Sequence, residues 1–345
     1  MKAKLIAAAL VLAAAAGLQN TAEGCSRVLY VGNDSLRIVG RSLDWKTPIP
    51  TNLYVYPRGM EKQGHDLPSA IKWTSKYGAV YAVGYDGGIT EGMNEKGLVV
   101  SGLFCKGTVY VNDTNNDRPP MSLSMFPAWL LDQCATTDEA VAMLREQNFT
   151  ISGLTFDSGT VSTLHWGITD ETGKSAMIEF TQGNLNIYEG QDIPVLTNDP
   201  NFPQMNAIND YWLAKGGTNT LPGTVSSPDR FVRAYFFDHH VEKTGDSDLG
   251  LSIVRSILYN VSVPYTYTAG EANVSSTQWR SFANIRDRLY YFDIVTNPGI
   301  FYVDLNKCDL RPGAPVMKID TSKSKDYIGD VTSKLFKTQP FTPMY

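Results

Sequence analysis

Hydrophobic and polar positions alternate in some parts of the chain and recur at helical spacing in others. Alternating patterns bounded by turn residues predict early strands at 25–31, 36–39, 79–84 and 98–104. After a loop at 108–120, helical spacing predicts two helices, at 122–134 and 136–147. Alternation then returns and predicts strands at 164–169, 175–181 and 185–188. The rest of the chain is expected to form three helices and then three strands, at 204–214, 228–241, 249–260, 279–283, 288–294 and 300–305.

These elements come in blocks of strands, then paired helices, then more strands. A parallel α/β sheet would need strands and helices in alternation, so the order indicates an α+β fold with sheets and helices in separate layers. At the second helix, Thr136 and Glu139 have the spacing of a capping box, which predicts the start of that helix. Neither an internal repeat nor a change of composition marks a boundary, so we expect residues 25–345 to form one domain.

The first 24 residues differ from the rest of the chain. Lys2 and Lys4 precede an apolar, alanine-rich run from 5 to 18, which is followed by a short polar stretch. This is the pattern of a secretory signal peptide and is too short for a stable transmembrane anchor. We therefore expect residues 1–24, a signal peptide with a short pro-segment, to be removed and the protein to be exported.

Composition argues against several classes of protein. The 345 residues carry 30 Lys and Arg against 35 Asp and Glu, a formal net charge of -5, so the chain has no basic surplus for nucleic-acid binding. After the leader, no apolar stretch is long enough to span a bilayer. The four histidines lack the spacing of a metal site, and we expect neither a metal nor a cofactor.

Cysteine usage separates one cysteine from the other three. Four cysteines are too few for a disulfide scaffold in an exported chain of this size. Cys105, Cys134 and Cys308 are expected to be buried as small apolar residues. Cys25 differs from them because removal of Gly24 would make it the first residue of the mature chain.

An N-terminal cysteine carries its own base. The free α-amine has a reference pKa of about 7.7–8.0, and the thiol beside it needs only modest help to ionise. Arg41 and Asp44 follow the second predicted strand, and a hairpin would bring that strand alongside Cys25. In that position Arg41 would favour the thiolate, and Asp44 would accept hydrogen bonds from the ammonium.

Several short motifs cover most of the mature chain in a fixed order. They are CSR at 25–27, GRSLDW at 40–45, GMNEKGL at 92–98, LHW at 164–166, LTNDPNF at 196–202, LPG at 221–223 and RFVR at 230–233. In these motifs the chain resembles the choloylglycine hydrolase family, which comprises bile salt hydrolases and penicillin V acylases. The family consists of N-terminal-nucleophile (Ntn) hydrolases. The resemblance implies a four-layer αββα sandwich, with two antiparallel sheets between helix layers, and a homotetramer.

The resemblance also implies a role for each matched position. Cys25 matches the nucleophile, Arg41 the arginine near the thiol and Asp44 the carboxylate that holds the α-amine. Asn198 matches the side-chain amide of the oxyanion hole, and Arg230 matches the arginine that completes the polar cluster. The implied mechanism is attack of the thiolate on an amide carbonyl, protonation of the leaving amine by the α-ammonium, and hydrolysis of the thioester by water.

Two features depart from the family pattern. The second oxyanion position is Asn in typical bile salt hydrolases and Tyr in typical penicillin V acylases, and here it aligns with Phe104, which can offer only its backbone N–H. The stretch from Asn198 to Arg230 is shorter than in Gram-positive members, where an extended loop serves tetramer assembly. The short stretch and the leader together resemble the Gram-negative branch of the family. This resemblance predicts a periplasmic or secreted protein. Trp45, Tyr54 and Phe104 are candidates for the apolar acyl pocket because they lie near the motifs.

The leading interpretation is an amidase that releases glycine or taurine from conjugated bile salts, which are small-molecule amides. The closest alternative is an acylase for penicillin V or for another N-acyl amide such as an acyl-homoserine lactone. A different class is a lipid-anchored binding protein with Cys25 as the acceptor, although Ala22 and Glu23 fit a lipobox poorly. A papain-like enzyme would need His165 as a catalytic partner, but the residues around Cys25 lack that signature and we expect His165 to be packed.

Overall fold

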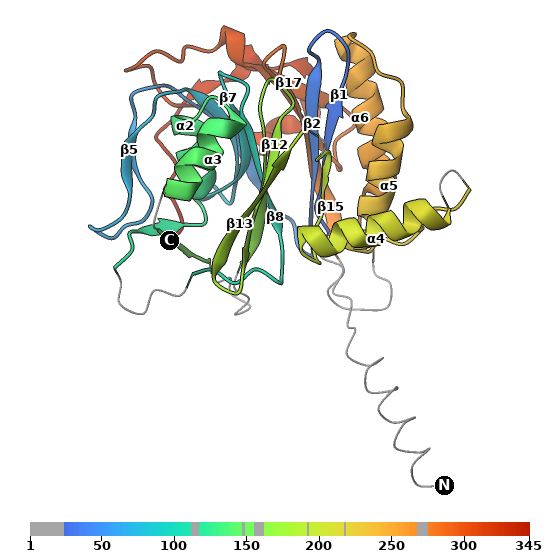
Figure 1. Cartoon of the computed structure of the whole chain (residues 1–345). Helices are drawn as coiled ribbons and strands as arrows, with labels where there is room; N and C mark the ends of the chain where they lie inside the picture. The colour runs from blue at the N-terminus through green and yellow to red at the C-terminus, as the bar shows by residue number, and fades with distance from the viewer. Residues whose placement is uncertain are drawn as a thin grey trace.

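The fold is a sandwich of two large sheets with helices on both outer sides (Figure 1). The computed structural model describes residues 24–111, 117–146, 149–154, 162–191, 193–216, 219–267 and 275–345. The predicted leader therefore lies outside the described residues, apart from Gly24. The layers confirm the expected α+β, four-layer αββα arrangement. Within the described ranges, no helix combines the length and apolar character needed to cross a membrane.

Within the described residues, the first sheet contains seven strands. In spatial order they are β14 (Val195–Leu196), β1 (Ser26–Val31), β2 (Arg37–Trp45), β15 (Ser276–Asn284), β16 (Leu289–Ile294), β17 (Ile300–Asp304) and β19 (Gly329–Asp330). Neighbours are antiparallel except β17 and β19, which pair in parallel over two residues.

The second sheet has nine strands in the part of the chain that the structure describes. Their spatial order is β13 (Asn184–Gly190), β12 (Ser175–Thr181), β11 (Leu164–Thr169), β8 (Val99–Phe104), β7 (Gly88–Asn94), β6 (Ala79–Gly84), β3 (Thr51–Tyr56), β18 (Met317–Ile319) and β20 (Phe336–Lys337). Short strands pair separately: β4 (Glu61–Gln63) with β5 (Lys72–Thr74), and β9 (Pro120–Ser122) with β10 (Thr150–Ser152). Turns of 3₁₀ helix occur at Leu305–Lys307, Thr321–Asp326 and Thr332–Lys334.

The helices form the two outer layers. α2 (Phe126–Gln133) and α3 (Thr137–Glu146) cover the second sheet, and α5 (Ser227–His240) and α6 (Ser247–Val261) cover the first. α4 (Phe202–Lys215) packs against α5. The capping interaction expected for α3 is present: Thr136 Oγ1 accepts from the Glu139 N–H at 3.2 Å, and the Glu139 carboxylate accepts from the Ala135 N–H.

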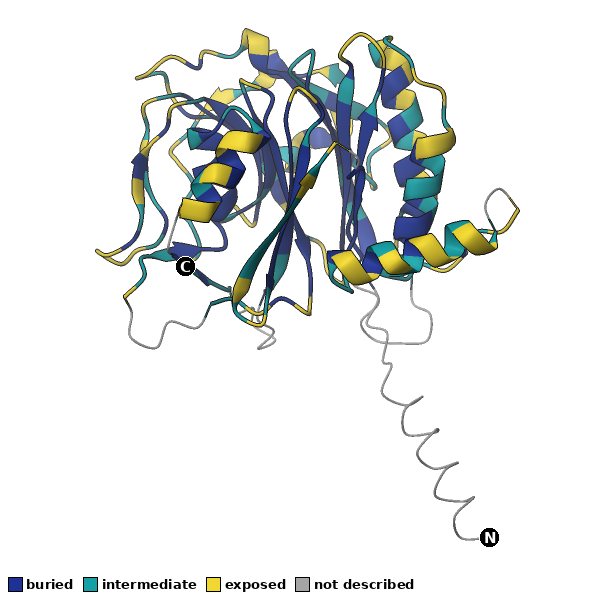
Figure 2. Cartoon of the chain, viewed as in Figure 1, coloured by how far each residue is buried: buried dark blue, intermediate teal, exposed yellow. Residues whose placement is uncertain are grey.

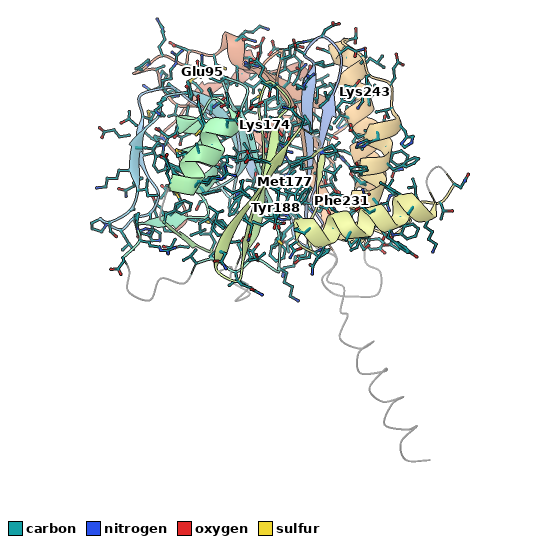
Figure 3. The ribbon with its side chains drawn as sticks, in the orientation of Figure 1. Glu95, Lys174, Met177, Tyr188, Phe231 and Lys243 are labelled. Carbon is teal, nitrogen blue, oxygen red and sulfur yellow. The ribbon has the colours of Figure 1, made fainter. Side chains whose placement is uncertain are left out.

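Two apolar cores hold the layers together, and the exposed residues lie mainly on the outer faces of the helices and in the loops (Figure 2). The first core fills the space between the sheets and beneath α5 and α6. It includes Met177 on β12 and Phe231 on α5, both labelled in Figure 3. The second core lies between the second sheet and α2, and it contains Trp129 and Trp166. Because both sheets are covered on both faces, most of their strands are buried throughout rather than on alternate residues.

The β1–β2 hairpin shows which residues point to which layer. Gly40 on β2 lies under α6, where a Cβ atom would be 2.6 Å from Val254 and 2.8 Å from Leu258. Side chains alternate between faces along a strand, so Ser42 and Asp44 point toward the helices and Arg41 points between the sheets. The missing Cβ of Gly40 allows α6 to pack directly on the strand that carries Arg41 and Asp44.

The sequence patterns missed some elements. β2 continues to Trp45, past the predicted end at residue 39, because residues 40–45 are mostly buried and pair with β15 instead of forming a turn. β3 and β7 were not predicted, and β7 is rich in glycine and polar residues, so it lacks a clear alternation. The first helix begins at Phe126 and not at 122, because Ser122 belongs to β9.

Candidate active site

Cys25 lies directly before β1 and is contacted from both faces of the first sheet. The residue is buried, with 5% of its surface exposed. Its Sγ is 3.9 Å from Arg41 Nη2, on the face toward the second sheet. Its main-chain N–H donates to Asn198 Oδ1 at 2.7 Å. The thiol and the main-chain nitrogen of Cys25 therefore lie in two different surroundings.

Arg41 is the cation beside the thiol. Its Nη2 donates to the Gly102 carbonyl at 2.9 Å, and its guanidinium lies 4.6 Å from the ring centroid of Trp279. Burial raises the pKa of the Cys25 thiol, and Arg41 is the strongest influence that opposes this rise. With Gly24 attached, the cysteine is therefore held mainly as the neutral thiol.

Glu91 on β7 lies behind Arg41. Its Oε2 is 4.0 Å from Arg41 Nε, and both side chains are almost fully buried. Its Oε1 accepts hydrogen bonds from the hydroxyls of Ser281 and Tyr290, which belong to the facing sheet. These contacts hold the carboxylate, and so restrict the position of the Arg41 guanidinium.

A second arginine shares this layer. Arg27 is fully buried and donates to Thr169 Oγ1 at 2.6 Å. Burial lowers the pKa of Arg27 to about 10, although Glu91 opposes this. Arg27 and Arg41 face one carboxylate, Glu91, so these three groups carry one net positive charge. A thiolate at Cys25 would balance that charge.

Arg230 on α5 organises the opposite side of Cys25. It is fully buried, and its Nη1 donates to the Cys25 carbonyl and to Ser26 Oγ, both at 2.6 Å. Its Nη2 donates to Asn198 Oδ1 at 2.8 Å, and its Nε donates to the Val225 carbonyl at 2.9 Å. The guanidinium thus fixes the main chain of Cys25 relative to Asn198.

The Asn198 amide has one orientation consistent with its neighbours. Its Oδ1 accepts from the Cys25 N–H and from Arg230, so its Nδ2 must face the Phe104 carbonyl, at 2.7 Å. An amide nitrogen carries two hydrogens, and this bond uses one of them. The second hydrogen can be donated to another acceptor near Cys25.

Asp44 is a buried carboxylate that makes no well-formed hydrogen bond. It is 1% exposed, and neither oxygen has a hydrogen-bond donor in suitable geometry among the described residues. Burial raises the pKa of Asp44 to about 6, although the Arg230 guanidinium, the Thr277 hydroxyl and two further arginines oppose this. Gly24 lies against it: a Cβ on Gly24 would be 2.8 Å from Asp44 Oδ2. If Gly24 were removed, the ammonium of Cys25 would place N–H donors beside this carboxylate.

A cavity of about 110 Å³ opens beside Cys25. The sequence candidates Trp45 and Phe104 line it, with ring centroids 6.0 Å apart. Tyr54 is not among its lining residues, so the prediction for Tyr54 is not supported. The Tyr54 ring packs against Tyr56 and Phe341 in the second core instead, because the β3 side chains at these positions face away from the first sheet.

The alternative readings of Cys25 fit this geometry poorly. A lipid on the sulfur would have to occupy the narrow cavity between the sheets. His165 does not line the cavity, and its ring forms hydrogen bonds with Glu179 and the Thr197 carbonyl.

Among the described residues, no cluster of His, Cys, Asp or Glu has the arrangement of a metal site. Cys105 and Cys134 are buried, Cys308 is partly buried, and none of the three is in a disulfide.

Three further residues of the site were not predicted from the sequence. They are Ser26, Glu91 and Met344. Ser26 lies inside the first motif and Glu91 directly precedes the motif at 92–98, so position next to a motif is the signal that could have indicated them. Met344 has no local signal, because tertiary packing brings it to the cavity.

Comparisons with known proteins agree with the geometry. A family model for linear amide C–N hydrolases of the choloylglycine hydrolase family matches residues 25–327. The chain is 33% identical over 342 residues to a penicillin V acylase of Pectobacterium atrosepticum, covering 92% of this chain and 91% of the relative. It is 28% identical over 316 residues to a bile salt hydrolase/transferase of Clostridium perfringens, covering 83% and 94%. The structure of penicillin V acylase from Agrobacterium tumefaciens has a TM-score of 0.85 at 38% identity, covering 93% of this chain and 99% of that one.

The buried Asp44 predicts how pH affects a chain that keeps Gly24. With a folded-state pKa near 6 against an ordinary value of 3.8, the folded chain binds more protons than the unfolded chain between those values. Stability therefore falls as pH rises through this window, by about 3 kcal/mol for Asp44 alone. We expect Asp44→Asn to remove this loss. Urea unfolding at pH 4 and pH 7, in a Cys25→Ala background shown by intact mass to keep Gly24, measures it. An unchanged pH dependence in Asp44→Asn would contradict the assignment.

Proposed function

The chain belongs to the choloylglycine hydrolase family of linear amide C–N hydrolases, and we propose that it is an acylase for amides of a small aromatic acyl group such as that of penicillin V. This reverses the order expected from the sequence, which placed conjugated bile salts first. Two observations support the change. Of the relatives above, the two with the higher identities are penicillin V acylases, and the cavity is small.

The size of the cavity is the main physical support. A cavity of roughly 150 Å³ holds benzene, and pockets for drug-sized ligands enclose roughly 300–1,000 Å³. The cavity beside Cys25, at about 110 Å³, is nearer in size to one aromatic ring than to a drug-sized ligand. The four fused rings of a bile acid would have to lie largely outside it. Trp45 and Phe104 provide aromatic surface for a phenoxy ring.

The proposed reaction uses both faces of the first sheet. The Cys25 thiolate, stabilised by Arg41, attacks the amide carbonyl. The second Asn198 Nδ2 hydrogen and the Phe104 backbone N–H stabilise the oxyanion, each worth roughly 3–4 kcal/mol. The α-ammonium of Cys25, held by Asp44, protonates the leaving amine. Water then hydrolyses the thioester with the α-amine as its base.

Processing, location and assembly are part of the same proposal. The mechanism needs a free α-amine, so removal of Gly24 must precede activity. The leader pattern supports export to the periplasm or the medium, and the family resemblance supports a homotetramer. Cleavage of an acyl-homoserine lactone would use the same site with a flexible acyl chain in place of the ring.

The direct test is a comparison of two substrates with one enzyme preparation. We expect the kcat/KM for penicillin V to exceed that for taurocholate by at least tenfold, measured by release of phenoxyacetate and of taurine. Cys25→Ala should abolish both activities, while Cys134→Ala, a buried thiol outside the cavity, should retain them. Faster release of taurine than of phenoxyacetate would overturn the proposal and restore the bile salt interpretation.

Met344 provides a second prediction, because its side chain lines the cavity and its main chain is held firmly. Its N–H donates to the Gly87 carbonyl at 3.0 Å, and its carbonyl accepts from the hydroxyls of Ser122 and Ser124. Met344→Ala should enlarge the cavity and shift preference toward longer acyl groups by tenfold or more, since a methylene is worth roughly 10–200-fold. The readout is the ratio of kcat/KM for decanoyl and phenoxyacetyl amides.

Met143→Ala is the matched control for this prediction. Met143 packs against the second core on α3, outside the cavity, so its replacement should leave the ratio of the two substrates unchanged. An equal ratio in wild type and Met344→Ala would show that Met344 does not limit the acyl group.

A further inference from the structure

His165 and Glu179 form a buried pair on neighbouring strands of the second sheet. Both side chains are nearly inaccessible, at 1% and 2% exposed, and both point toward the first sheet. His165 Nδ1 is 3.0 Å from Glu179 Oε1, and His165 Nε2 is 2.6 Å from the Thr197 carbonyl. The pair therefore contacts the segment that carries Asn198, although neither residue lines the cavity.

The neighbours of His165 determine its protonation. A neutral imidazole has one N–H donor and one acceptor nitrogen. Here one nitrogen faces a carboxylate and the other faces a carbonyl, and both of these groups only accept hydrogen bonds. Both ring nitrogens must therefore carry protons for the two contacts to be hydrogen bonds. The imidazolium is balanced by Glu179.

Glu179 holds the other end of the same segment. Its two oxygens accept from the Phe202 N–H, at 2.9 and 3.0 Å. Phe202 is the first residue of α4, and its N–H has no partner within the helix. The aromatic ring of Tyr188, labelled beside the start of α4 in Figure 3, lies 5.4 Å from that of Phe202. The pair thus holds both ends of the stretch from Thr197 to Phe202, with Asn198 directly after the held carbonyl.

We propose that the His165–Glu179 pair is a positioning device for Asn198, in which a doubly protonated imidazole fixes the peptide group that precedes the oxyanion donor. This inference rests on the proposed role of Asn198. The ionisable groups that face His165 are Glu179 from β12 and Cys105, which follows β8. Burial acts to lower the pKa of His165, but Cys105 and Glu179 outweigh it and hold this pKa well above its ordinary value. Loss of the hydrogen bond to Thr197 would let the amide of Asn198 move from its position near Cys25.

Two double variants isolate that hydrogen bond. His165→Gln with Glu179→Gln removes both charges together, keeps an amide donor that can reach the Thr197 carbonyl, and keeps an acceptor for the Phe202 N–H. His165→Leu with Glu179→Gln is equally uncharged but cannot donate to Thr197. Comparing the two separates positioning from the effect of burying an unpaired charge.

The comparison has a specific expected result. The Gln/Gln variant should keep kcat within about fivefold of wild type, whereas the Leu/Gln variant should lose roughly a hundredfold, as expected for a donor displaced by about 1 Å. KM and the rate of Cys25 alkylation by iodoacetamide should stay within about threefold in both, because the cavity and thiol are untouched. Equal kcat values in the two variants would overturn the proposal.

A control shows whether loss of stability alone lowers kcat. Lys62 and Asp132 form another buried ion pair, 2.9 Å apart, outside the cavity. Lys62→Met should lower the melting temperature but leave kcat unchanged. All assays use the acyl amide that the wild type cleaves fastest. A failure to cleave penicillin V would therefore contradict the proposed substrate but would leave this test valid.

Nitrogen NMR of ¹⁵N-histidine-labelled wild type tests the protonation state without relying on variants or activity. We expect both ring nitrogens of His165 to show the shifts of protonated nitrogens throughout pH 5 to 9. A signal of an unprotonated ring nitrogen within that range would contradict the proposal, whether or not the double variants fold.

Discussion

Successive side chains of a strand point to opposite faces of its sheet, and this alternation divides the environment of Cys25 in two. Arg41 points between the sheets and reaches the thiol, while Asp44, three residues later on the same strand, points toward the helices, where Gly24 and Arg230 lie. One cysteine can therefore act as nucleophile and base in two separate electrostatic environments. A change of register by one residue would exchange these environments and remove both functions.

Each of the two environments is incomplete while Gly24 is attached, but in a different way. Between the sheets, Arg27 and Arg41 exceed Glu91 by one positive charge, which a thiolate would balance. On the helix side, the oxygens of Asp44 make no well-formed hydrogen bond, and an ammonium would supply one. Removal of Gly24 would create the ammonium, and so give the buried carboxylate the hydrogen bonds that it lacks in the unprocessed chain. The same event that completes the site chemically would therefore also relieve a cost of burial.

The sequence was informative where a residue type is required by local chemistry. The motifs singled out Cys25, Arg41, Asp44, Asn198 and Arg230, each in a short, distinctive string of residues. The structure brings these five residues together. Periodicity predicted most helices and strands, but it missed β7. The glycines and polar residues of β7 show no alternation in the sequence, although packing in the fold buries most of them. Local sequence also failed to indicate the contacts of Tyr54, Glu91 and Met344. These contacts depend on how distant segments of the chain pack together.

The central claim is that Cys25 acts as the first residue of the mature chain, with its free α-amine beside Asp44. Intact mass and N-terminal sequencing of the active protein test this most directly. We predict a chain that begins at Cys25 with an unmodified thiol, and no activity in any fraction that retains Gly24. An active chain that still carries Gly24, or a diacylglyceryl group on the Cys25 sulfur, would contradict the account.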